Sequence, residues 1–166
     1  MDAMSRPSLK KIFGIGLLGG LISIGLLLLA AWIDHHAGLG AMTSYEAVVR
    51  WLGGLLILLG LGVHGWSFVT LRQWWFGNQL CTRGPFHYVR HPMYAAWISL
   101  IAPGLVLILN RWIYLLWLVA LHPIWLGLVR REERSMERHF GKTYRRYAAR
   151  TGRFVPRLKA LNPPRS

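Results

Sequence analysis

Two polar stretches contain the residue types that could bind a charged ligand or do acid–base chemistry. The stretch "RGPFHYVRHPMYAAW" contains Arg90, His91 and Tyr94, and the stretch "EERSMERHFGKTYRRY" begins with Glu132 and Glu133. Guanidinium and carboxylate groups form charge-assisted hydrogen bonds, and imidazole, phenol and carboxylate groups can transfer protons. Brought together, the two stretches would form a site with groups for both charges of a zwitterion.

The first stretch also has the signals of a helix start. Gly84 and Pro85 favour a turn, and Pro92 suits the first position of a helix, where its missing N–H costs nothing. His91 would then lie at the cap and Tyr94 in the first turn. Free N–H groups at a helix start bind anions, so we expect an anion near Arg90.

A helical hairpin would bring the two stretches together. Apolar runs at about 93–109 and 112–129 are separated only by Asn110 and Arg111. The start of the first run and the end of the second should therefore lie on the same side. Adjacent helical residues point about 100° apart, so we expect one of the two glutamates to face the shared pocket and the other to pair with a neighbouring arginine. The candidate arginines are Arg130, Arg131 and Arg138.

This set of groups predicts the ligand. A carboxylate would bind the helix start and Arg90, an ammonium would bind a glutamate, and a sulfonium would lie near Tyr94 or Tyr144 through cation–π contact. S-Adenosylmethionine carries all three charges, and we expect it as the cofactor. The histidines show no metal-ligand spacing, so no metal site is predicted.

The elements that must hold these residues are membrane spans. The chain has 166 residues, of which 54% are hydrophobic and only 16% charged, which is too apolar for an ordinary soluble domain. A spanning helix needs about 20 mostly apolar residues. Besides the two apolar runs of the hairpin, the chain has two more such runs, at about 12–32 and 48–70. We predict an all-α integral membrane protein with about four transmembrane helices and a C-terminal cytoplasmic amphipathic helical tail.

The placement of positive charge predicts orientation and partners. Twelve of the twenty Lys and Arg residues follow residue 129, and only Arg50 and Arg111 would lie on the opposite side. By the positive-inside rule, both termini and the 71–92 loop are cytoplasmic, in an inner or plasma membrane. The net charge of +14 then favours anionic lipid over nucleic acid, because the basic residues adjoin the spans. We expect the bilayer and a lipidic substrate as partners.

The chain divides into three parts. Residues 1–78 form a scaffold of two spans, residues 79–158 form the core with the hairpin and the tail, and residues 159–166 form a frayed end. In the tail, four apolar or aromatic residues recur at helical spacing, which predicts one amphipathic helix from Arg130 to about Ala149 with a break or bend at Gly141. These four residues are Met136, Phe140, Tyr144 and Tyr147.

The two stretches resemble the isoprenylcysteine carboxyl methyltransferase family, which is also similar to phospholipid N-methyltransferases. The resemblance rests on "TRGPFHYVRHPMY", a hairpin with Asn110 at its tip, and "EERSMERHFGKTYRRYAARTGRFVP", and covers about residues 79–157. One departure is that Ala95 and Ala96 stand where a glycine often follows the RHP-x-Y element.

The resemblance implies a membrane methyltransferase with S-adenosylmethionine bound between the last two spans and the tail. It implies catalytic roles for Arg90, Tyr144 and Arg153, the last from the terminal element that ends at Pro156. The cofactor-binding residues that it implies are Arg90, His91, Pro92, Tyr94, Glu132, Glu133, Phe140, Tyr144 and Tyr147.

Several alternatives remain open at the level of sequence. The acceptor can be a prenylated cysteine carboxylate, a phospholipid amine or a small thiol. Some membrane sterol reductases look similar over the hairpin and use NADPH, and a non-catalytic adaptor with a lipid-binding tail is a further alternative. Neither the use of a general base nor the oligomeric state follows from the sequence.

Overall fold

The computed structural model describes residues 10–74 and 79–157, with the side chains of residues 10–14 left aside, and within these ranges the chain is almost entirely helical. Two long helices come first, α1 (Lys10–Ala37) and α2 (Glu46–Trp74). A short helix, α3 (Pro85–Tyr88), precedes a third long run made of α4 (Pro92–Ala96), the π-helical turn η1 (Trp97–Ile101) and α5 (Ala102–Leu109). The chain ends in α6 (Trp112–Phe140) and α7 (Lys142–Arg150).

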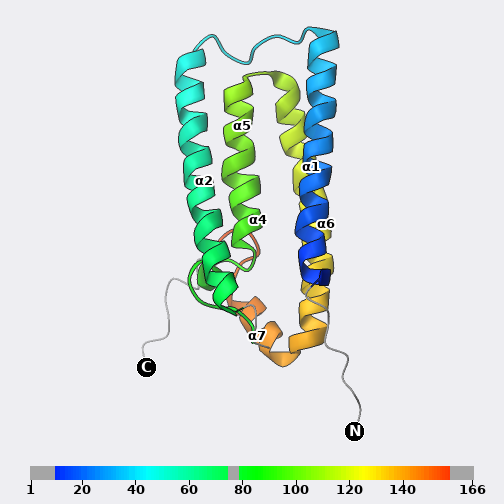
Figure 1. Ribbon diagram of the computed structural model, residues 1–166, viewed down its shortest axis with the longest axis vertical. Helices are drawn as coiled ribbons and strands as arrows, with labels where there is room; N and C mark the ends of the chain where they lie inside the picture. Colours follow the sequence, from blue (N-terminus) through cyan, green and yellow to red (C-terminus); the bar gives the residue numbers. More distant parts are fainter. Residues whose placement is uncertain (1–9, 75–78, 158–166) are drawn as a thin grey trace.

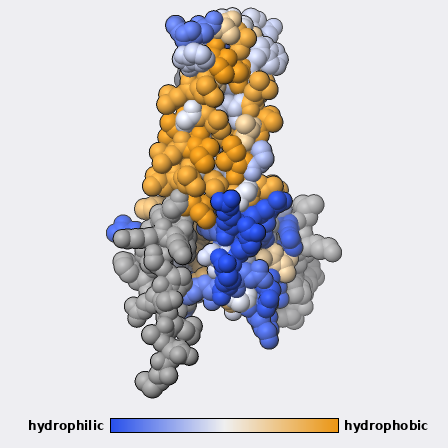
Figure 2. All heavy atoms as spheres, turned by 90° about the vertical axis from the view of Figure 1, so that its right-hand side faces the viewer, coloured by the Kyte–Doolittle hydropathy of each residue, from blue (hydrophilic) through white to orange (hydrophobic). Residues whose placement is uncertain are grey.

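Four of these runs are long and apolar enough to cross a membrane. They are Ile15–Ala37, Glu46–Trp74, Pro92–Leu109 and Trp112–Phe140. Many of their apolar side chains face outward, including Leu17, Leu58 and Leu116. Figure 2 shows an apolar column above a hydrophilic end. The prediction of an all-α membrane protein with four spans is therefore confirmed.

The spans pack as two pairs joined by the hairpin (Figure 1). Helix α2 lies along α4, η1 and α5, while α1 lies along α6, and α5 contacts α6. Glycines allow both pairs to approach closely. A Cβ at Gly53 would lie 2.5 Å from the Gly104 carbonyl oxygen, and one at Gly19 would lie 2.7 Å from the Trp125 ring. Small residues at such contacts are typical of helices that associate in lipid.

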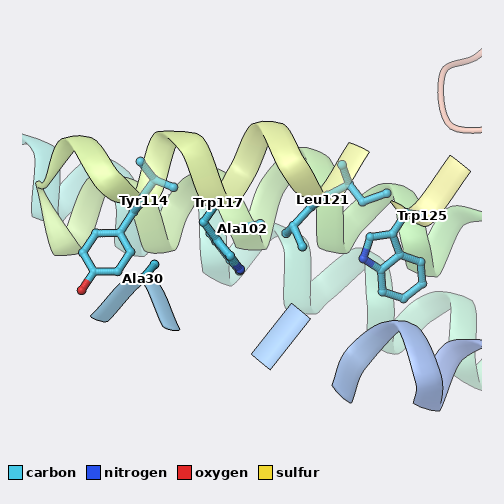
Figure 3. Close-up of a cluster of buried hydrophobic side chains, with 8 residues drawn as sticks. Ala30, Ala102, Tyr114, Trp117, Leu121 and Trp125 are labelled. Atoms are coloured by element: carbon cyan, nitrogen blue, oxygen red, sulfur yellow. The ribbon is translucent and has the colours of Figure 1, made fainter. Parts of the chain in front are cut away.

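The core lies mainly between α1, α5 and α6, with Trp117, Leu121 and Trp125 stacked along α6 (Figure 3). Both buried indoles have hydrogen-bond partners on α1. Trp117 Nε1 donates to the Ser23 carbonyl at 2.9 Å, and Trp125 Nε1 donates to Ser23 Oγ at 3.1 Å. These bonds fix the register between the first span and the last.

The hairpin tip is at Asn110 and Arg111, as predicted. Asn110 adopts a left-handed conformation with φ 50°, and its side chain forms two hydrogen bonds with the backbone of Thr43, at 2.8 and 3.2 Å. Arg111 lies 3.8 Å from Asp34 and donates to the Leu39 carbonyl. The tip thereby holds the α1–α2 loop at the end of the molecule opposite α7.

The helix that contains the fourth span extends well beyond the predicted apolar run. The helix does not end near residue 129 but continues without a break to Phe140. Gly141, with φ 54°, then breaks it, and α7 follows in a new direction. The four apolar residues of the predicted tail helix are thus divided between α6 and α7. The predicted frayed end, residues 159–166, lies outside the described residues.

Candidate functional site

The site begins with an extended segment between two short helices. Helix α3 ends at Tyr88, Val89 is extended, and Pro92 occupies the first turn of α4, as predicted. His91 is the N-cap residue but forms no capping hydrogen bond through its side chain. The Arg90 and His91 N–H groups form no helical bond and pair with another segment.

That partner is the C-terminal segment, residues 151–157. Val89 and Gly152 form a parallel bridge, the Arg90 N–H donates to the Gly152 carbonyl at 2.8 Å, and the His91 N–H donates to the Arg153 carbonyl at 3.1 Å. A Cβ at Gly152 would lie 1.7 Å from the Val155 carbonyl oxygen. Only glycine fits there. Sequence reasoning missed this pairing, for which the lone glycine after α7 is the available signal.

Glu133 joins three segments through an ion cluster. Its Oε1 lies 2.9 Å from Arg90 Nε and 2.8 Å from Arg90 Nη2. Its Oε2 accepts two hydrogen bonds from Arg153, one of them at 3.0 Å from Nε. Arg90 Nη1 also donates to the carbonyls of Ala148 and Thr151. Each nitrogen of the Arg90 side chain thus has a protein partner, and its predicted role in cofactor binding stays a prediction.

Glu132 points toward the spans. Its side chain is 8% exposed, and its Oε2 accepts a hydrogen bond from the Tyr94 hydroxyl at 3.1 Å. The Tyr94 ring also packs against Trp125, with centroids 4.9 Å apart. We expected one glutamate to pair with Arg130, Arg131 or Arg138, and this was wrong: both reach the first stretch, Glu132 through Tyr94 and Glu133 through Arg90.

His91 lies between the two glutamates. Its ring is buried and stacks on Tyr94, with centroids 5.6 Å apart and an interplanar angle of 9°. Nδ1 is 4.0 Å from Glu132 Oε1 and Nε2 is 3.4 Å from Glu133 Oε1. The second distance lies within hydrogen-bond range, but the geometry is poor, and Nε2 has no hydrogen-bond partner. A ligand that offers Nε2 a well-aligned partner would relieve this cost.

The two tyrosines of α7 have different surroundings. The Tyr147 hydroxyl donates to the Phe86 carbonyl at 2.5 Å and so fixes α7 against α3. Tyr144 is 4% exposed, and its hydroxyl has no hydrogen-bond partner. Burial, followed by the charge of Glu133, raises the pKa of Tyr144. The phenol therefore stays protonated at neutral pH and can donate a hydrogen bond.

A pocket of about 340 Å³ lies beside this cluster, which we call the polar pocket. It is bounded by the continuation of α6, by α7 and by the C-terminal segment. The hydrogen bonds from Arg153 to Glu133 raise the already high pKa of Arg153, which remains charged. The residues that line the pocket are Arg130, Glu133, Arg134, Glu137, Tyr144, Ala148 and Arg153.

The structure thus brings most of the predicted site residues together. Arg90, His91, Tyr94, Glu132 and Glu133 contact one another, and Arg153 joins them through Glu133. Phe140 is not a lining residue of the polar pocket, and its ring contacts His139 at the end of α6. In the described part of the chain, no group of three or more His, Cys, Asp or Glu side chains could hold a metal ion.

Fold and site together define a helical membrane protein with an ion cluster and a polar pocket at one end of its spans. The sequence model of the phospholipid methyltransferase family matches residues 48–143. The match covers more than half of the chain, which therefore belongs to this family. Neither the curated proteins nor the solved structures include a significant match.

Membership implies a membrane methyltransferase of a family that acts on lipid-like substrates. The family match also extends the resemblance seen in the sequence. The motifs reached only residues 79–157, whereas the match begins at residue 48 and so includes most of α2.

Proposed function

We propose that this protein transfers the methyl group of S-adenosylmethionine to a lipidic acceptor, with the carboxylate of a prenylated cysteine as the first candidate. One observation supports this most. The ion cluster of Arg90, Glu133 and Arg153 unites both sequence motifs and the C-terminal segment at the edge of the polar pocket. Segments far apart in the sequence are thus held together where a charged ligand would bind.

The residues of the polar pocket fit S-adenosylmethionine. Glu133 and Glu137 offer carboxylates for its ammonium, and Arg130 and Arg134 offer cations for its carboxylate. The Tyr144 hydroxyl lacks a protein partner there and can donate to the ligand. When bound, this cofactor supplies a methyl group on a positively charged sulfur, which makes that carbon open to displacement.

The chain's own residues would position the acceptor. Displacement at carbon needs the acceptor atom and the methyl carbon held in line, which can be worth about 7–11 kcal/mol. Arg153, whose side chain is 28% exposed, can orient an acceptor carboxylate, whereas Arg90 at 8% acts through Glu133 as a positioning residue. A carboxylate acceptor loses no proton and needs no base.

A phospholipid amine is the second candidate, and two observations favour it. The family match is to phospholipid methyltransferases. An amine must lose a proton before it attacks, and the buried Glu132, bonded to Tyr94 and 4.0 Å from His91, is a proton acceptor next to the pocket. A carboxylate acceptor gives Glu132 only a structural role.

The acceptor is identified by incubating the purified protein in vesicles with labelled S-adenosylmethionine and one acceptor at a time. A prenylated cysteine, phosphatidylethanolamine and a small thiol are compared. We expect label in the prenylated cysteine. Label in the phospholipid alone would establish the second candidate, and label in the thiol alone would show that the acceptor is not lipidic.

The cofactor is tested by calorimetric titration of S-adenosylmethionine and of NADPH. We expect binding of the first only, weakened at least about tenfold by Glu133→Ala or His91→Ala. Glu46→Ala is the control, because Glu46 is exposed and pairs with Arg50 at the opposite end. Tight NADPH binding would instead favour a reductase, and binding of neither cofactor would favour an adaptor.

A further inference from the structure

The first span contacts the candidate site, although the sequence motifs and the family match both leave it out. Helix α1 ends at Ala37, whereas the family match begins at residue 48 and the motifs begin at residue 79. The sequence predicted only a scaffold here. In the structure α1 lies along α6, and Gly16 of α1 lies against Tyr94 of α4. No motif predicts this contact.

Small residues on one face of α1 lie against aromatic residues of α4 and α6. Gly16, Gly19 and Ser23 recur at spacings of three and four, which places them on the same face of the helix. A Cβ at Gly19 would lie 2.7 Å from the Trp125 ring, and Ser23 Oγ accepts the hydrogen bond from Trp125 Nε1 at 3.1 Å. The position of α1 therefore fixes the Trp125 ring.

Gly16 leaves room for the hydroxyl group of Tyr94. A Cβ at this position would lie 3.2 Å from the Tyr94 oxygen, which is closer than ordinary van der Waals contact. The same oxygen donates the hydrogen bond to Glu132 Oε2 at 3.1 Å. A side chain at position 16 would displace this hydroxyl and disturb its bond to Glu132.

Tyr94 links this contact to the ion cluster. Its ring packs against Trp125, with centroids 4.9 Å apart, and stacks on His91, with centroids 5.6 Å apart and an interplanar angle of 9°. His91 Nε2 lies 3.4 Å from Glu133 Oε1, and Glu133 lines the polar pocket. A displaced Tyr94 would therefore shift the imidazole that lies between the two glutamates.

We propose that the first span positions the site: Gly16 leaves space for Tyr94, which keeps its bond to Glu132 and holds His91 beside Glu133. This inference rests on the proposed function, because it makes the affinity for S-adenosylmethionine depend on α1. Gly16 is a positioning residue, since it acts on the polar pocket only through Tyr94.

The first test measures the affinity of Gly16→Ala for S-adenosylmethionine by calorimetric titration. We expect the dissociation constant to rise at least about fivefold, because residues in contact are energetically coupled. Gly20→Ala is the matched control on α1, since a Cβ there meets nothing within 4 Å. Its dissociation constant should stay within about twofold of that of the unmodified protein. Equal affinities of the two variants would contradict the proposal.

Gly53→Ala distinguishes positioning from a general loss of stability. A Cβ at Gly53 would lie 2.5 Å from the Gly104 carbonyl oxygen, and its nearest neighbours all belong to α5. We expect this variant to melt at a lower temperature, because the α2–α5 contact is overpacked, and to bind S-adenosylmethionine with unchanged affinity. If it weakens binding as much as Gly16→Ala does, the role of Gly16 is structural and the proposal is wrong.

The second test removes the hydroxyl group that Gly16 accommodates. Tyr94→Phe loses the bond to Glu132, so we expect its dissociation constant to rise. In this background, Gly16→Ala should change the affinity by less than about twofold, because the close contact at 3.2 Å is with the hydroxyl oxygen. Fully additive effects of the two substitutions would show that Gly16 does not act through Tyr94.

Melting temperatures of the same proteins without cofactor separate this proposal from the proposed function. Non-additive melting temperatures, in a protein that binds no S-adenosylmethionine, would support positioning of Tyr94 by α1 and overturn the proposed function. Binding of S-adenosylmethionine that Gly16→Ala leaves unchanged would overturn the role of α1 and leave the proposed function standing.

Discussion

Glu133 is the residue on which the site depends. It lies between the guanidinium groups of Arg90 and Arg153, and its side chain is only 12% exposed. The two cations and the carboxylate stabilise one another in this poorly solvated place, because each charge alone would have a desolvation cost of several kcal/mol. The net positive charge of the trio leaves it able to attract an anion.

We expect Glu133→Gln to destabilise the protein by about 3 kcal/mol, because it removes one partner of a buried ion pair. In a chain of this size, this lowers the melting temperature by roughly 5 °C or more, measured in detergent by intrinsic fluorescence. Glu137→Gln is the control on the same helix. Its pair with Arg145 is exposed at 3.6 Å, so its effect should stay below about 1 kcal/mol. Equal losses would show that the ion cluster has no structural importance.

At the residue scale, the sequence predicted which side chains lie close together but not all of the groups to which they bind. Opposite charges, a shared hairpin and adjacent positions were enough to bring Arg90, His91 and Tyr94 to the two glutamates. The hydrogen bonds from Arg90 to the carbonyls of Ala148 and Thr151 could not be predicted, because every residue has a backbone carbonyl and its position carries no sequence signal.

In α6, the end of the apolar run is not the end of the helix. Charged residues after Val129 indicate that the chain leaves the apolar layer, but they do not end a helix. Arg and Glu are good helix formers, and no glycine or proline occurs between Arg130 and Gly141. Helix α6 therefore continues for several turns beyond the predicted boundary, and Glu132 and Glu133 lie on a rigid extension of the fourth span.

The third span carries a feature that periodicity cannot show. An apolar run predicts a helix without specifying whether its turns are α or π, and Pro103 alone allows a kink, a π turn or a helix end. This run packs against α2, a contact between distant segments that periodicity does not show. The pairing of residues 89–91 with the C-terminal segment is another such contact.

The close contact between α2 and α5 leads to a prediction about stability. We expect Gly104→Ala to destabilise the protein by about 1–3 kcal/mol, since its Cβ would lie 2.7 Å from the Gly53 carbonyl oxygen and from Ile57, and overpacked cores cost this much. Thermal unfolding in detergent measures this loss of stability.

Gly62→Ala is the matched control on α2. A Cβ there meets nothing within 4 Å, and alanine favours a helix over glycine by about 1 kcal/mol. The melting temperature should stay the same or rise. A drop for Gly62→Ala as large as that for Gly104→Ala would show that helix contact is not the cause.

At the scale of the whole molecule, the two ends differ in charge. The end at which α6 continues into α7 carries most of the arginines and the whole candidate site, whereas the opposite end holds Arg50 and Arg111, each near a carboxylate. Figure 2 shows the hydrophilic end below the apolar column. We expect this asymmetry to set the direction of the protein in a membrane, with the candidate site near one membrane surface.

We expect the end that holds α7 to face the cytoplasm, because basic segments next to spans are retained there. Two cysteine variants at exposed positions test this, Ser44→Cys in the α1–α2 loop and Thr143→Cys on α7. A membrane-impermeant maleimide applied to intact cells should label Ser44→Cys, and it should label Thr143→Cys only after the membrane is permeabilised. The unmodified protein is the control, since Cys81 is buried. The opposite labelling pattern would place the candidate site outside the cell, away from the cytoplasmic supply of cofactor that the proposed function requires.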